Sequence, residues 1–544
     1  MSLRPRLPVR LRLGAAFALV LVATPAAAAT PADTVVMAKQ IDDMISLDPA
    51  ESFEVSGQEA IGNLYDKLLA ADPHHPGQVL GRLAEGWSVA ADGRTFTFRI
   101  RAGVRFASGN PLTAADIAFS LRRAVRLDRS PAFILGQFGL TPRTVRQRIT
   151  APAPDRLVLV TAEPVAPSLL YLCLTAAVGS VVDSRLVREH ARDGDFGNRW
   201  LKTHSAGSGP FVLRVWRADE RYTLLANPTY WAGAPAVRRV IVVHVPEPSM
   251  QRLLLERGDV DYARNLGPDQ LRALAGRPDV AIEVGAKSGL LYLALNQRDD
   301  VLARPDVREA LKYLVDYGKI AVMLAPSFAV HQSPLPDGLL GAVDAQPYRF
   351  DPAHARDLLA KAGLGQGFSV RLDTQGAAPW IEIAQVIQAN FAAAGVRLAI
   401  VPADLKQILT RYRARNHQIA MLTWDPDYPD PHSNAQAFVA NPDNRPDAAI
   451  KTLAWRNSWA DPALTRLAAA AAREPDDARR AALYGRLQAR FEAVAPFVVM
   501  FQESEAVAHR RTVDGFVIGA GGAPDAYRFL KKRAAGAAPQ ARAQ

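Results

Sequence analysis

The sequence of 544 residues contains a single cysteine, Cys173. One thiol cannot build a disulfide framework, and it cannot supply the several thiolates of a zinc ribbon or an iron–sulfur cluster. Cys173 lies in the apolar run 170–174, which predicts a buried and unreactive thiol. Disulfide-rich and thiolate-metal classes of protein are therefore excluded.

The chain also lacks a strongly charged body, although its formal net charge is +11. Four arginines and no acid stand in residues 1–29, and four basic residues and no acid stand in residues 531–544, which leaves only +3 for the residues between. With 49% hydrophobic and 22% charged residues, the composition is that of a folded protein. We therefore expect no nucleic-acid partner, since the positive charge lies at the two ends.

Only the N-terminus carries a long apolar run, and that run has the form of an export signal. Arginines at positions 4–12 precede the apolar residues 13–23, and Ala27-Ala28-Ala29 offers a cleavage site before Thr30. The run is shorter than the ~20 residues that cross a bilayer. We predict that residues 1–29 are a cleaved signal peptide and that the protein is periplasmic, the alternative being an uncleaved anchor. Residues 534–544, rich in Ala, Pro, Gln and Arg, are predicted to be a disordered tail.

Motifs for catalysis or cofactor binding are missing. The sequence contains no phosphate-binding loop of the G-x-x-x-x-G-K type, no H-E-x-x-H zinc motif and no serine on a strand-to-helix elbow. We therefore predict a protein that is not an enzyme and that holds no cofactor and no metal. A secreted hydrolase with a triad assembled in space remains an alternative.

What the sequence does contain is an alternation of strand and helix signals. Residues 95–100 alternate polar and apolar, and Thr113 with Asp116 forms a capping box that begins a helix. Asp351-Pro352 begins a helix that ends at Gly363, followed by a strand at 368–372, a helix at 381–394 and a strand at 396–401. This order predicts an α/β fold. If the chain forms two lobes, we expect it to cross between them near 285–289 and 497–504.

The most unusual segment is 424–431, in which Trp424, Asp425, Asp427, Tyr428 and Asp430 alternate with three prolines after the apolar strand 419–423. The prolines make the segment rigid and non-helical. Carboxylates beside an indole suit a cationic ligand group. A calcium site and a solvated turn are the alternatives, and the segment lacks the glycine and terminal glutamate of an EF-hand loop.

The chain resembles the extracellular solute-binding proteins of the family that serves peptide, dipeptide and nickel ABC importers (solute-binding protein family 5). Several motifs occur in the order of that family and together extend over the mature chain. They are residues 83–87, 92–98, 103–106, 108–116, 207–211, 227–231, 293–296, 306–311, 351–363 and 424–431.

The resemblance implies the two-lobed periplasmic-binding-protein fold (Venus-flytrap, class II or cluster C) with an extra subdomain in the N-terminal lobe. It places lobe I at 30–285 plus 503–533 and lobe II at 286–502. It also implies that a ligand binds between the lobes and that the closed form is presented to an inner-membrane ABC permease by a monomer. The expected ligand is a di- or oligopeptide.

Ligand-binding roles implied by the resemblance fall on Asp427, Trp424, Asp425 and Trp380. Asp427 stands three residues after the tryptophan, where peptide-binding members pair an acid with the α-ammonium of the ligand. Dipeptide binders often carry an arginine in the loop that here spans 374–380, but this loop has no basic residue. This departure argues against a strict preference for free dipeptides and leaves a longer peptide, a peptide with a modified C-terminus or another amine open. Nickel chelates and small cationic solutes such as opines are alternatives.

Overall fold

The computed structural model describes residues 30–72, 75, 77–519 and 525–533. The predicted signal peptide (1–29) and the predicted tail (534–544) lie outside these residues. In the described part, no helix has both the length and the apolar character needed to cross a bilayer.

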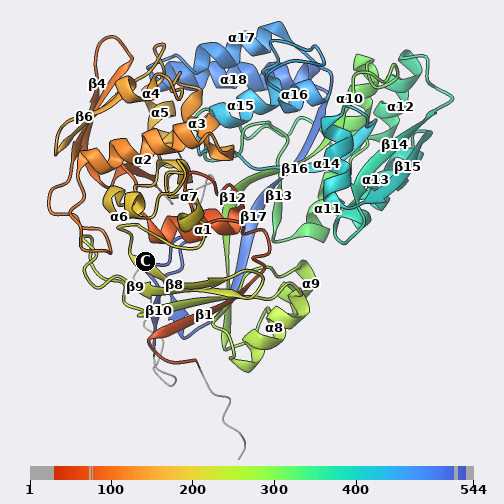
Figure 1. The fold of residues 1–544 in the computed structure, drawn as a ribbon. Coiled ribbons are helices and arrows are strands. Elements are labelled where there is room, and N and C mark those ends of the chain that lie inside the picture. The colour runs from red at the N-terminus through yellow and green to blue at the C-terminus, as the bar shows by residue number, and fades with distance from the viewer. Residues whose placement is uncertain (1–29, 73–74, 76, 520–524, 534–544) are drawn as a thin grey trace, which may run out of the picture.

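One large mixed sheet runs through most of the described chain (Figure 1). In spatial order its strands are β15 (Val396–Ala403), β14 (Phe368–Gln375), β16 (Ile419–Trp424), β12 (Val280–Leu295), β17 (Phe497–Arg510), β11 (Tyr262–Ala263), β1 (Thr34–Lys39), β10 (Arg239–His244), β9 (Arg221–Ala226) and β8 (Phe211–Arg217), with β13 (Phe328–Val330) paired to β17. The pair β14–β15 and the pair β1–β10 are parallel, whereas β12 pairs antiparallel with both of its neighbours.

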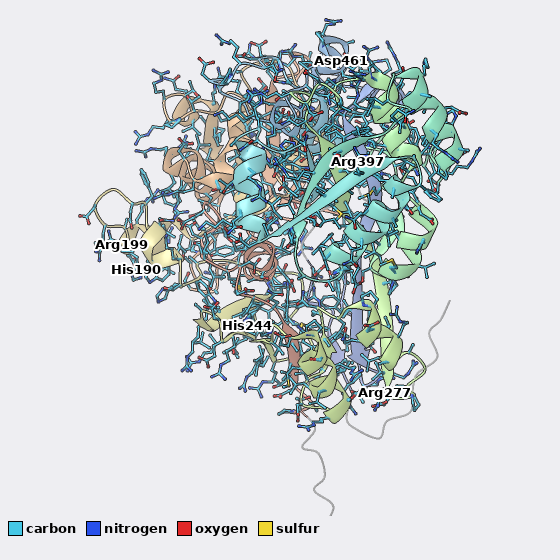
Figure 2. The ribbon with its side chains drawn as sticks, turned by 90° about the vertical axis from the view of Figure 1, so that its right-hand side faces the viewer. His190, Arg199, His244, Arg277, Arg397 and Asp461 are labelled. Atoms are coloured by element: carbon cyan, nitrogen blue, oxygen red, sulfur yellow. The ribbon has the colours of Figure 1, made fainter. Side chains whose placement is uncertain are left out.

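The long strands β12 and β17 join two halves of this sheet. The C-terminal part of β12 pairs with β16 on one side and with the N-terminal part of β17 on the other. The C-terminal part of β17 pairs with the start of β12 and, at His509, with β11. The β12–β17 register shifts between Ala286 and Leu290. Such a bulge bends a strand and changes where its side chains point. Figure 2 shows the same two halves from the side, with Arg397 of β15 above and His244 of β10 below.

Helices cover both faces of the half that contains β14–β16. Along β12, Leu291, Leu293 and Leu295 enter one core, and Leu290 and Tyr292 enter the other, because successive strand residues face opposite sides. The first core includes α10 (Pro305–Tyr313), α11 (Tyr317–Leu324), α12 (Pro352–Lys361) and α13 (Trp380–Ala392). The second includes α14 (Leu405–Arg413), α15 (Pro431–Val439), α16 (Leu453–Arg456), α17 (Pro462–Ala471) and α18 (Asp477–Val494).

The half that contains β1 and β8–β11 is covered in the same way. On one face pack α1 (Val55–Leu64), α6 (Ser184–Glu189) and α7 (Asn198–Leu201), and on the other α8 (Pro248–Arg257) and α9 (Pro268–Leu274). A short pair of strands, β18 (Val513–Asp514) and β19 (Lys531–Lys532), closes the described chain.

A separate core forms a subdomain in the N-terminal part of the chain. Its sheet has the order β4 (Ala84–Val89), β5 (Thr95–Ile100), β7 (Arg156–Val160) and β6 (Ile149–Ala153), beside the short pair β2 (Leu69–Ala71) and β3 (Val79–Gly81). Against it pack α2 (Ala114–Leu127), α3 (Phe133–Gly136), α4 (Val145–Arg148) and α5 (Pro167–Cys173), with 3₁₀ turns at Ser130–Ala132 and Ala177–Gly179. Tyr428, far away in sequence, also enters this core with 2% of its surface exposed.

Local predictions from the sequence are confirmed where it carries caps. The strand at 95–100 is β5, and α2 begins with the capping box of Thr113 and Asp116. The Asp351 side chain accepts a hydrogen bond from the His354 N–H at the start of α12. Cys173 is fully buried, as expected from its apolar neighbours.

Candidate functional site

Two carboxylates meet over a glycine where the two long strands bulge. The register pairs Leu290 of β12 with Trp424 of β16 on one side and with Gln502 of β17 on the other. Gly289 precedes Leu290, whereas Asp425 and Glu503 follow Trp424 and Gln502, so the three residues lie beyond the same end of this paired row because the strands are antiparallel. A Cβ atom on Gly289 would lie 2.5 Å from Glu503 Oε2 and 2.8 Å from Asp425 Oδ1. Glycine is therefore required at 289 to let the two carboxylates converge.

Three carboxylates at this place lack partners. Asp425 and Glu503 neither accept a hydrogen bond nor form an ion pair within the described part of the chain, and the same is true of the carboxylate of Asp427. Only the backbone N–H of Asp427 is engaged, donating to Ser433 Oγ at 2.8 Å. Each of the three carboxylates is thus available to a ligand.

The missing partners change the proton affinity of these groups. Burial raises the pKa of Glu503 to about 7, and the charge of Asp425 adds to this effect. Burial also raises the pKa of Asp427 to about 7, opposed by the nearby charge of Arg456. Asp425 is reached by solvent but surrounded by protein, so its pKa is raised as well, with Lys287 opposing. A cation at this place would restore the ionised forms.

A second layer of charges lies two residues further along β12 and β17, at Lys287 and Glu505, and it is balanced. Arg264 contacts Glu59 at 2.8 Å and also pairs with Glu505 and Asp525, while Lys287 Nζ lies 2.7 Å from Asp525 Oδ1 and 3.0 Å from Glu505 Oε2. Lys39 pairs with Glu59. Three cations face three carboxylates here. Burial alone would raise the pKa of Glu505, but Arg264 and Lys287 bring it down to about 2.

The two tryptophans expected at the site occupy different positions. Trp424 ends β16, is partly buried against the α14–α18 core, and its indole N–H donates to Asn434 Oδ1 at 3.3 Å. Trp380 is the first residue of α13 and packs edge-on against Phe328, with ring centroids 6.4 Å apart. Phe328 pairs in register with Glu503. Trp380 therefore lies two side chains away from the row formed by Asp425, Gly289 and Glu503, which we call the acidic row.

Two other residues of the 424–431 segment are structural. Tyr428 fills the N-terminal subdomain core, and its hydroxyl donates to Gln137 Oε1 at 3.3 Å. Asp430 caps α15 and forms a buried ion pair with Arg480 at 2.6 Å. The rigid segment therefore anchors at Tyr428 and Asp430, which holds Asp425 and Asp427 in place between them and the sheet.

Sequence reasoning missed Glu503, Lys287 and Gly289 as parts of the site. The signal available was that Lys287 and Glu503 stand next to the apolar runs 290–295 and 497–501, at the places where crossings between lobes were expected. Among the described residues, no group of three or more His, Cys, Asp and Glu is arranged to hold a metal ion.

Comparison with known proteins gives consistent matches. The family model of the bacterial extracellular solute-binding proteins, family 5 (middle), matches residues 78–445. The probable D,D-dipeptide-binding periplasmic protein DdpA of Escherichia coli (strain K12) is 28% identical over 90% of this chain and 92% of that protein. Di/tripeptide-binding protein 2 of Pseudomonas aeruginosa is 27% identical over 83% of this chain and 86% of that protein.

Solved structures match over nearly the whole chain. The periplasmic binding protein DppA of Helicobacter pylori, in complex with the peptide STSA, has a TM-score of 0.74 at 24% identity and covers 92% of this chain and 97% of its own. HbpA2 of Haemophilus parasuis has a TM-score of 0.76 at 22% identity, covering 92% of this chain and all of its own. The fold is that of a two-lobed periplasmic binding protein.

Proposed function

The chain belongs to family 5 of the bacterial extracellular solute-binding proteins, and from that premise we propose that it captures di- or oligopeptides for an ABC importer. In this proposal the ligand binds between two lobes, and the closed protein delivers it to a permease in the inner membrane. Closure must be driven by contacts that only the closed, ligand-bound form makes.

The proposed lobes comprise 30–285 with 503–533, and 286–502. Support comes from the sheet, in which β12 and β17 are the strands that belong to both halves. The acidic row of Asp425, Gly289 and Glu503 lies at the bulge of these strands, where the proposed boundary falls. Ligand bound there would contact both lobes at once.

The observation that carries the proposal is the excess of negative charge at this boundary. Asp427 is proposed to pair with the α-ammonium of the peptide, and Asp425 with Glu503 to receive a second cationic or amide donor. Burying an ammonium without such a partner would cost several kcal/mol. Trp424 and Trp380 are proposed to pack against the apolar part of the ligand.

The charge balance also restricts the ligand. No basic residue lies in 374–380 to pair with a peptide carboxylate, and Lys287 is already held by Glu505 and Asp525. The preferred ligand is therefore a peptide with a free amine and with its C-terminus distant, modified or offset by a basic side chain.

Four further properties belong to the same proposal. The protein acts by stoichiometric binding and not as an enzyme, it is a monomer, it is periplasmic, and residues 1–29 are removed on export. The relative from Escherichia coli is itself described as periplasmic.

A thermal-shift screen of the purified protein tests the proposal. The ligands are free di-, tri- and longer peptides, their N-acetylated forms, peptide amides, amino acids, opines, and Ni²⁺ with and without histidine. A ligand at a hundredfold excess over its Kd stabilises the folded state by about 2.7 kcal/mol. Stabilisation by free peptides that is lost on N-acetylation supports the proposal. Stabilisation by nickel chelates or opines alone would contradict the peptide assignment and make that solute the ligand. Turnover of a peptide would point to a hydrolase.

A further inference from the structure

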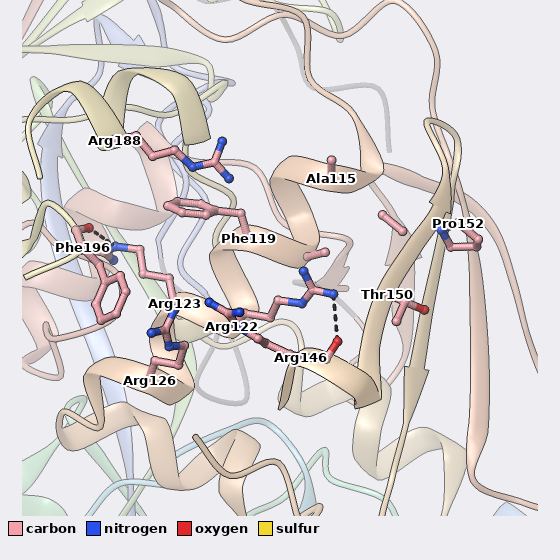
Figure 3. Close-up of a pocket in the computed structure, with 12 residues that line it drawn as sticks. Ala115, Phe119, Arg122, Arg123, Arg126, Arg146, Thr150, Pro152, Arg188 and Phe196 are labelled. Carbon is pink, nitrogen blue, oxygen red and sulfur yellow. Dashed lines mark hydrogen bonds between the residues drawn. The ribbon is translucent and has the colours of Figure 1, made fainter. Parts of the chain in front are cut away.

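A second recess, unrelated to the acidic row, lies on the N-terminal subdomain. It encloses about 740 Å³ between α2, α4 and the chain around α6, with Phe119 and Phe196 among the apolar residues that line it (Figure 3). Small-molecule sites are typically ~300–1,000 Å³. The recess is therefore large enough for a small organic molecule, not only for a single ion.

Arginines surround this recess, and two of them lie over aromatic rings. The Arg126 guanidinium lies over the Phe196 ring at 4.3 Å, and that of Arg188 lies over the Phe119 ring at 4.6 Å. Figure 3 shows Phe119 between Arg188 and Arg122. A guanidinium that lies over a ring can still donate its N–H groups to an oxyanion while the ring restricts its movement.

No acid offsets these charges. The lining residues include no aspartate or glutamate. Within the described residues, none of Arg122, Arg126, Arg146 and Arg188 forms an ion pair. Arg123, in contrast, is buried and donates hydrogen bonds to both carboxylate oxygens of Asp48, so it has a structural role and is not available to a ligand.

The crowding of like charges is visible at Arg122. Its side chain donates to the backbone carbonyls of Ile149 at 2.8 Å and of Arg146 at 3.0 Å. Burial and the charge of Arg146 lower the pKa of Arg122. Repulsion of this kind destabilises the ligand-free state, and a bound anion would relieve it.

The backbone at one wall adds an independent feature. Phe196 has a φ of +52°, in the left-handed region that bulky side chains rarely adopt. This conformation is held by the Arg123 Nε, which donates to the Phe196 carbonyl at 2.7 Å. The result is that the Phe196 ring is turned under Arg126. Backbone strain of this type is concentrated at binding sites.

We propose that this recess, formed around Phe119 and Phe196 by Arg122, Arg126, Arg146 and Arg188, is a binding site for a phosphate-bearing ligand with an apolar portion. Several guanidinium forks can satisfy the several oxygens of a phosphate group, while the rings contact the apolar portion. The phosphate group can come from a soluble phosphate ester or from the headgroup of an anionic phospholipid. The site is separate from the acidic row, so its occupation does not depend on the proposed peptide function.

Titration calorimetry of the full chain at low salt tests the site. The probes are inorganic phosphate, phenyl phosphate, and vesicles of phosphatidylcholine with and without phosphatidylglycerol. The test variant is Arg126→Gln with Arg188→Gln. The matched control is Arg397→Gln with Arg473→Gln, which removes the same charge at two exposed positions of the other half of the molecule. In Figure 2, Arg397 lies apart from His190, which follows Arg188 by two residues.

We expect phenyl phosphate to bind more tightly than inorganic phosphate, and we expect its affinity to fall as salt is added. Only in the test variant should its affinity fall by roughly tenfold or more. Binding only to vesicles that contain phosphatidylglycerol, lost in the test variant, would assign the site to a lipid headgroup. The proposal is overturned if no probe binds, or if the test and control variants bind alike. Thermal unfolding of both variants, with and without the peptide from the screen, shows that fold and peptide site are intact.

Discussion

Affinity for a peptide amine is expected to fall steeply as the pH is lowered from about 8 to about 5. The ligand-free protein holds Asp427 with its pKa raised to about 7, because the carboxyl is buried without a partner. An ammonium pairs only with the ionised carboxylate. Binding therefore lowers the pKa of Asp427 and releases a proton wherever the free protein is protonated.

The sign and size follow from linkage. A carboxyl with a pKa of about 7 is almost fully protonated at about pH 5, and ionising it there costs roughly 2.7 kcal/mol, which is a hundredfold in Kd. The ligand's own α-ammonium loses its proton only near pH 8. Affinity should thus be greatest between about pH 7 and 8 and fall about a hundredfold by pH 5.

Calorimetric titration of the peptide at several pH values, in two buffers of different ionisation enthalpy, measures both the Kd and the protons released. Asp427→Asn is the matched variant: it keeps the shape of the side chain and removes the titrating group. Its peptide affinity should be lower at pH 8 and should depend less steeply on pH, and the pH dependence that remains should come from Glu503. A wild-type Kd that is flat between pH 8 and 5, or a slope unchanged in the variant, would refute the assigned role of Asp427.

Substitutions of Gly289, Arg264 and Tyr428, two of them with a control variant, test the surrounding structure. Gly289→Ala places a methyl group between the two carboxylates and should weaken peptide binding, measured by calorimetry, about tenfold or more. The control is Gly485→Ala in α18, where an added Cβ has no neighbour within 4 Å, and it should leave peptide affinity unchanged. Arg264→Met removes one of the three cations that face the three carboxylates of the second layer, leaves an excess of buried negative charge, and should lower the unfolding free energy by about 3–5 kcal/mol in urea. Tyr428→Ala should cost a similar amount by vacating the subdomain core, whereas Tyr428→Phe loses only a long hydrogen bond and should cost ~1 kcal/mol; equal losses in both would contradict a packing role.

The sequence was most informative about elements with local signals. Caps at Asp351 and Thr113 and the glycine at 363 marked helix ends because they act on neighbouring backbone groups. The alternation in residues 95–100 marked β5 for the same reason. The continuity of one sheet through both halves had no such signal, since strand order depends on pairing between residues far apart in the chain.

The same limit applied to the site. The segment 424–431 was recognisable from its composition, but its division into anchors and available carboxylates was not. Asp430 is neutralised by Arg480, fifty residues later, and Tyr428 enters a core built from residues before 182. Glu503 becomes part of the site only through its register with Gly289 and Phe328. None of these pairings can be deduced from spacing.

Glu503 and Glu505 show how position along one strand determines the role of a charge here. The two residues are two apart on β17 and therefore point to the same face. Burial acts on both, yet the pKa of Glu505 is brought down to about 2 by Arg264 and Lys287, and that of Glu503 is raised to about 7 beside Asp425. Glu505 forms ion pairs with Arg264 and Lys287, whereas Glu503 forms an ion pair with no cation among the described residues. A ligand that brings its own positive charge completes the balance at the boundary of the two proposed lobes, so the contact that recognises the ligand is also one that favours closure.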